Sequence, residues 1–263
     1  MSASPDRDNP FAPPRAAVLE AASPLAGELV AEGQKVAASR GVAWLAEGWE
    51  GFLRAPGMWL ATCLVFGVIW IVLSFLPLLN LVSGILGPVF LGGIMLGCDK
   101  LRQGHALELS DLFSGFQRNA GGLLLVGLLY LVGWFLIMAF VGIGMAVVVG
   151  VAFSPNDLRG LVTAGPAILL IALVAVGLSM PLIMAIWFAP ALVVFHELQA
   201  TAAMRASFSG CLRNMGPFLL YGLVSLVAAI VAILPVGLGL LVLFPVIWGS
   251  MYAGYRDIFV RAG

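Results

Sequence analysis

The sequence contains little charge. Asp, Glu, Lys and Arg make up only 10% of its 263 residues, whereas 62% of the residues are hydrophobic. A soluble domain averages about 25% charged residues, so this composition excludes an ordinary soluble protein and indicates an integral membrane protein. The formal net charge is zero and gives no sign of a partner. We expect no nucleic-acid partner.

The sequence also lacks the patterns that carry catalysis or metal binding. His105 and His196 are not at metal-ligand spacing with other ligands, and no HExxH, phosphate-binding loop or dinucleotide fingerprint occurs. No acidic or basic residue lies within the apolar runs before their cytoplasmic ends, which argues against a proton relay or ion-coupling site. We therefore expect no enzymatic activity, no cofactor and no metal. The cysteines have no CxxC spacing and are expected to be free thiols: Cys63, Cys98 and Cys211.

Residues 1–40 differ from the rest of the chain. They are rich in Pro, Ala and charge and contain no apolar segment like the core of a signal peptide. This composition predicts a disordered cytoplasmic tail, followed by a membrane domain over residues 41–263.

Six apolar runs follow the tail, at about 58–76, 81–98, 122–152, 161–195, 217–234 and 236–254. A bilayer core about 30 Å thick needs about 20 helical residues, so each run is long enough to cross it. The sequence thus predicts an all-α polytopic bundle with six transmembrane helices. Only short Pro-containing turns at 77 and 235 separate neighbouring runs, which leaves a re-entrant hairpin open at either place.

The positive charges predict the orientation of this bundle. With six spans, every Lys and Arg falls on one side of the membrane except Arg159. Positive residues concentrate on the cytoplasmic side, so both termini are expected there, in a bacterial inner membrane.

A nine-residue pattern occurs twice, as FSGFQRNAG at 113–121 and FSGCLRNMG at 208–216, each directly before an apolar run. A weaker copy, GFLRAPG at 51–57, keeps the Gly and Arg but loses the Asn. The second span of each pair repeats as well, beginning at Pro88, Pro181 and Pro245. These matches predict three units, at about 41–105, 106–198 and 199–260.

Each unit would consist of a cytoplasmic amphipathic helix followed by two spans. An even number of spans keeps the copies in one orientation, so a pseudo-threefold axis along the membrane normal is expected. In the first lead-in helix, helical spacing sets Leu45, Trp49 and Phe52 on one stripe, with Trp44 beside it and Glu47 and Glu50 off it. Such a helix is expected to lie at the headgroup level.

The repeated motif supplies the first set of candidate site residues. Arginine presents a planar fork of donors that suits a lipid phosphate, and asparagine adds another donor. The alternative, which we prefer, is structural: Arg extends to the headgroups while Asn caps or ends the lead-in helix. The residues concerned are Arg54, Arg118, Asn119, Arg213 and Asn214.

A second set lies where the three second spans leave the membrane. We expect these residues to pair with the arginines of neighbouring lead-in helices and tie the copies together, rather than to act in catalysis. They are Asp99, His196, Glu197, Arg256 and Asp257.

The stretch MPLIMAIWFAPALV at 180–193, the Ala-Xaa-Arg-Ala-Ser element at 203–207 and CLRNMGPFLLYGL at 211–223 carry a resemblance. They resemble uncharacterised bacterial six-span membrane proteins, which are similar to the membrane domain attached to some glycerophosphoryl diester phosphodiesterases. The resemblance implies an inner-membrane protein over about residues 40–260. The hydrolase domain of those enzymes is absent here, so their catalysis does not carry over.

Three functions remain, in order of preference. The first is a non-enzymatic protein that organises lipids or partner proteins at the cytoplasmic face, with membrane lipids, a membrane protein or a second copy of the chain as partner. The second is a channel or carrier for a small or lipidic solute. The third, an intramembrane enzyme, lacks a recognisable nucleophile, acid-base pair or metal set.

Overall fold

The computed structural model describes residues 28–75, 77–152 and 159–261. The first 27 residues of the predicted tail and most of the stretch between the third and fourth apolar runs lie outside them. The described chain is helical apart from one pair of two-residue strands. Its elements are β1 (Glu28–Leu29), α1 (Arg40–Arg54), α2 (Pro56–Ser74), α3 (Pro77–Arg102), the 3₁₀ helix η1 (Leu109–Phe113), α4 (Ser114–Gln117), α5 (Ala120–Ala152), α6 (Arg159–Trp187), α7 (Ala189–His196), α8 (Ala200–Arg213), α9 (Met215–Ile233), α10 (Leu240–Phe259) and β2 (Val260–Arg261).

Five helical segments are long and apolar enough to cross a membrane. They lie at Pro56–Ser74, Leu81–Arg102, Ala120–Gly150, Ala164–His196 and Met215–Ile233. The sixth predicted span corresponds to α10, which is not among them. Its last two turns carry Arg256 and Asp257, and most of its C-terminal half is buried against other helices. A helix covered by protein needs no continuous apolar surface, so α10 is less uniformly apolar than the others.

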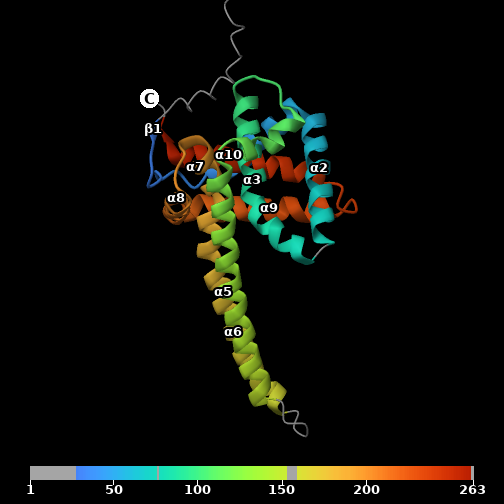
Figure 1. Cartoon of the computed structure of the whole chain (residues 1–263), viewed down its shortest axis with the longest axis vertical. Coiled ribbons are helices and arrows are strands. Elements are labelled where there is room, and N and C mark those ends of the chain that lie inside the picture. Colours follow the sequence, from blue (N-terminus) through green and yellow to red (C-terminus); the bar gives the residue numbers. More distant parts are fainter. Residues whose placement is uncertain (1–27, 76, 153–158, 262–263) are drawn as a thin grey trace, which may run out of the picture.

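The molecule has two parts of different character (Figure 1). The helices α5 and α6 form a long hairpin that projects from the remaining bundle, and α9 and α10 run across the direction of this hairpin. At 1.5 Å per residue, the 33 residues of α5 measure about 50 Å, more than the ~30 Å of a bilayer core. Large apolar side chains along the hairpin are exposed, for example Leu136 and Ile143.

The core lies in the other part, and its buried residues come from α1, α2, α3, α7, α8 and α10, among other elements. Trp44, Phe188, Tyr255 and Phe259 are almost completely buried there. The rings of Phe188 and Phe259 lie 5.5 Å apart in an edge-to-face arrangement, which is the geometry favoured by aromatic quadrupoles. This packing holds α1 against α10, and the charged residues of the pocket described below lie on these two helices and on α3.

A face with two glycines packs α1 into the bundle. The buried residues of α1 are Gly41, Trp44, Gly48 and Phe52, whereas Trp49 is 47% exposed. A Cβ atom on Gly48 would lie only 2.2 Å from the carbonyl oxygen of Val246 in α10. Of the predicted stripe, Trp49 is exposed and Phe52 is buried, so the location of this helix at the headgroup level stays a prediction. Close backbone approach buries small residues that carry no hydrophobic signal.

Two further contacts follow the same pattern. A Cβ atom on Gly115 in α4 would lie 2.0 Å from the carbonyl oxygen of Val89, one residue after Pro88 in α3. In α8, the buried hydroxyl of Ser207 donates to the carbonyl of Met184 in α6. Each lead-in segment thus lies on a Pro-containing helix.

Ser207 also explains why α6 ends at Trp187. Its hydroxyl accepts a hydrogen bond of 2.9 Å from the Phe188 N–H while donating to Met184, three residues before the bend. The side chain therefore takes the place of the Phe188-to-Met184 bond of a continuous helix, an insertion that kinks helices. Pro190 at the start of α7 removes a further backbone donor.

Residues 28–39, which the composition assigned to the disordered tail, have defined contacts. Glu28 and Leu29 pair antiparallel with Arg261 and Val260, and the Gln34 N–H donates to the carbonyl of Ile258. The tail prediction was therefore wrong for this segment. Its partners are backbone groups at the far end of the chain, which the local composition does not reveal.

Candidate functional site

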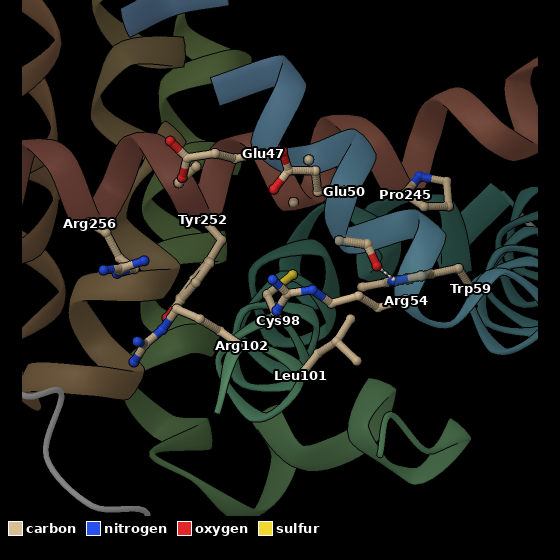
Figure 2. A pocket seen from close by; sticks show the side chains of 14 residues that line it. Glu47, Glu50, Arg54, Trp59, Cys98, Leu101, Arg102, Pro245, Tyr252 and Arg256 are labelled. Atoms are coloured by element: carbon tan, nitrogen blue, oxygen red, sulfur yellow. Dashed lines mark hydrogen bonds between the residues drawn. The ribbon is translucent and has the colours of Figure 1, made fainter. Parts of the chain in front are cut away.

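A pocket with a cavity volume of about 150 Å³ lies between α1, α3 and α10 (Figure 2). Buried side chains line part of it, among them Trp59, Cys98 and Tyr252. Charged side chains enter from all three helices: Glu47, Glu50, Arg54, Arg102 and Arg256. Side chains of both signs thus line one pocket.

The spacing along α1 places three of these charges on one face. Residues three or four positions apart share a face of a helix, so Glu47, Glu50 and Arg54 all point to the same side. The helix ends there because Ala55 precedes Pro56, and proline disfavours a helical conformation of the residue before it. The indole of Trp59 then donates a 3.1 Å hydrogen bond to the carbonyl of Gly51, which ties α2 to the end of α1.

Arg102 is held by a polar network at the edge of the pocket. It bonds Asp99 through a 3.1 Å ion pair and the hydroxyl of Tyr252 at 3.0 Å. Tyr252 in turn donates to Asp99, which is only 4% exposed, and Gln103 donates to the other carboxylate oxygen. A buried carboxylate with this many donors is well compensated, so Asp99 joins α3 to α10 as a structural group.

A second network lies behind the pocket. Arg40 donates to Asp257 and to Glu47, and the indole of Trp44 donates to the same Asp257 oxygen at 2.7 Å. The hydrogen bond that Arg40 donates to Asp257 is the main cause that raises the pKa of the Arg40 guanidinium above its usual value. Arg40 and Asp257 therefore neutralise each other within the protein, and one carboxylate oxygen of Glu47 accepts a hydrogen bond from Arg40.

Three charged groups of the pocket remain without such partners. Within the described residues, neither Arg54 nor Arg256 forms an ion pair or a side-chain hydrogen bond with the protein, and the same is true of Glu50. The side chains of Arg54 and Glu50 are exposed, and Arg256 is partly exposed. They are free to bind a ligand.

The other arginines of the repeated motif have partners in the protein. The Nε atom of Arg118 donates to the carbonyl of Val194 at 3.2 Å, near the C-terminus of α7, where a positive charge is favourable. Arg213 pairs with Glu32 and also donates to the carbonyl of Gly33. Of the three candidate phosphate ligands, Arg54 alone has no such contact in the described structure.

The two asparagines of the motif differ from each other. Asn119, with φ of 54°, accepts the N–H of Gly122 and so caps the start of α5. Asn214 is 1% exposed, accepts the N–H of Val36 and donates to the carbonyls of Gln34 and Gly210. It therefore fixes the N-terminal segment against α8.

Of the four acidic or histidine residues expected to pair with lead-in arginines, only Asp257 does so among the described residues. His196 Nε2 lies 2.7 Å from the hydroxyl of Tyr255, a contact between α7 and α10. Glu197 ends α7 in a left-handed conformation with φ of 53°. Asp257 contacts Arg40 as described, whereas Asp99 pairs with Arg102 of its own helix rather than with a lead-in arginine.

Several residues of the site were missed by the sequence analysis. Arg102 could have been noticed from its spacing of three residues after Asp99, which places the two on one helix face. Tyr252 and Arg40 gave no comparable signal because their partners Asp99 and Asp257 lie far away in the sequence. Glu47 lies seven residues after Arg40 on the same helix, a two-turn spacing that could have been noticed. In residues 28–75, 77–152 and 159–261, no group of three or more His, Cys, Asp or Glu side chains is arranged to hold a metal ion.

Comparisons with known proteins agree with the composition. The chain is 28% identical over 233 residues to a probable inner membrane protein of Burkholderia thailandensis, and the match covers 83% of each chain. The chain is a helical membrane protein. No family model matches it, and no solved structure does. The resemblance to a membrane domain of glycerophosphoryl diester phosphodiesterases therefore gains no support from them.

Proposed function

We propose that the chain is a non-enzymatic inner-membrane protein that organises lipids at the cytoplasmic face. The observation that carries this proposal is the pair Arg54 and Arg256, which line one pocket without a carboxylate partner in the described structure. Arginine suits phosphate because its planar fork can donate two hydrogen bonds at once. A partner protein at the same face is the less favoured form of this function, since no described surface indicates its chemistry.

The proposed topology puts this pocket at the headgroup level. β1 pairs with β2, so the segment before α1 and the segment after α10 lie at the same end of the molecule. A chain that starts and finishes on one side has crossed the membrane an even number of times. This supports six crossings with α10 as the last, and an excess of Lys and Arg on the side of the termini supports a cytoplasmic location.

Three units in a closed arrangement form part of the proposal. The lead-in helix α1 lies on α10, the segment around α4 lies on α3, and α8 lies on α6 and α7. Each lead-in segment thus contacts the Pro-containing helix of the unit before it, and α1 closes the ring onto the last unit. This regularity supports the repeats inferred from the sequence.

Native mass spectrometry of protein extracted gently from bacterial membranes tests the proposal. We expect phospholipid to remain bound after dilution of the detergent, because the retained lipid satisfies the two arginines. Protein that emerges without phospholipid would contradict the proposed function. Solute flux in reconstituted vesicles, without retained lipid, would favour the carrier instead.

A further inference from the structure

The pocket between α1, α3 and α10 presents charges of both signs to a ligand. Among the described residues, Arg54 and Arg256 are cations of the lining without an ion-pair partner, and Glu50 is an anion of the same lining without one. A purely anionic headgroup would use the arginines but would lie beside the Glu50 carboxylate, and like charges at close range repel. A headgroup with both a phosphate and an ammonium group uses all three side chains.

The dimensions of the pocket fit a headgroup rather than a whole lipid. Its volume of about 150 Å³ is roughly ten times the about 10–15 Å³ of cavity that holds one water, but it is far too small for acyl chains. Apolar surface suited to these chains lies on the neighbouring face of α1, where Trp49 is 47% and Leu53 55% exposed. An exposed indole is favoured at the membrane interface. This combination points to a lipid rather than a soluble phosphate compound.

Relying on the proposed lipid function, we propose that this pocket binds the phosphoethanolamine headgroup of an aminophospholipid. The phosphate accepts hydrogen bonds from Arg54 and Arg256, and the ammonium group donates to Glu50. Glu47 contributes less, because one of its oxygens already accepts a hydrogen bond from Arg40. Arg102 remains in its network with Asp99 and Tyr252 and shapes the wall of the pocket.

The test compares lipid retention by the full chain in nanodiscs that contain equal amounts of phosphatidylethanolamine and phosphatidylglycerol. The variants are Arg54→Gln, Arg256→Gln and Glu50→Gln. Arg205→Gln is the matched control, because Arg205 is an exposed arginine of α8 outside the pocket. Thermal unfolding of every variant shows whether the fold is kept.

We expect the wild type to retain phosphatidylethanolamine in preference to phosphatidylglycerol. Loss of one charge-assisted contact reduces binding by about tenfold, so Arg54→Gln and Arg256→Gln should lower retention of both lipids by roughly this factor. Glu50→Gln should abolish the preference while phosphatidylglycerol remains bound. Arg205→Gln should behave like the wild type.

Three results would overturn the inference. The first is a wild type that retains lipid without preference for the amine, and the second is a set of pocket variants that retain lipid as well as Arg205→Gln. The third is displacement of the lipid by millimolar inorganic phosphate or free phosphoethanolamine, which would identify a soluble ligand. In all three cases lipid retention by the wild type would still support the broader function, whereas absence of any retained lipid would contradict the inference and the broader function.

Discussion

Replacing Gly48 by alanine tests the packing that places α1 beside the pocket. The added Cβ would lie 2.2 Å from the carbonyl oxygen of Val246 and 2.8 Å from the backbone N of Ser250. Both contacts are with backbone, so α1 and α10 must separate by about 1 Å to restore ordinary van der Waals distance. Overpacking of this kind typically costs about 1–3 kcal/mol. We expect the free energy of unfolding to fall by an amount near the upper end of that range, because no side-chain rotation relieves the clash.

The matched control is Gly51→Ala, three residues further along the same helix. A Cβ atom on Gly51 meets nothing within 4 Å, so the change should be neutral or should stabilise α1 by about 0.5–1 kcal/mol through helix propensity. Thermal unfolding of the two variants in the same detergent measures the difference. Equal stability of Gly48→Ala and Gly51→Ala would refute the close approach of α1 and α10.

Three further predictions concern other parts of the bundle. Ser207→Ala should destabilise the protein by about 1–3 kcal/mol because two buried backbone groups lose their partner, whereas Ser209→Ala, which removes an exposed contact, should change unfolding little. Burial raises the pKa of the Cys211 thiol to about 12, so iodoacetamide at pH 8 should label it only after unfolding, and rapid labelling of folded protein would contradict this. Val236 is 96% exposed in the turn between α9 and α10. With six crossings, Val236→Cys should react with an impermeant maleimide from the periplasm, and labelling only in opened cells would contradict that topology.

The helices could be predicted because their cause is local. Long apolar runs and a proline at the first position, as in Pro56, determine where helices occur and begin. The roles of the arginines could not be predicted in this way. Arg118 and Arg54 occupy the same place in the repeated motif, yet one donates to the carbonyl of Val194 and the other faces a pocket.

Backbone acceptors account for much of that difference. A carbonyl group exists at every position, so the sequence carries no sign that Val194 or Gly33 will accept a bond from an arginine. The burial of α10 was missed for a related reason, since its partner Gly48 contributes close approach without hydrophobicity. The part of the site that was anticipated, Arg54, lines the pocket without an ion-pair partner among the described residues.

The pairing of the N-terminal segment with the end of the chain has a consequence for biosynthesis. Gln34 donates to the carbonyl of Asp257, a partner 223 residues later, and Val36 donates to Asn214, 178 residues later. A ribosome releases the first of these residues long before it has made their partners. The segment therefore lacks these partners until translation is nearly complete, and a chain that stops before Asp257 would keep an unpaired N-terminal segment that proteases can recognise.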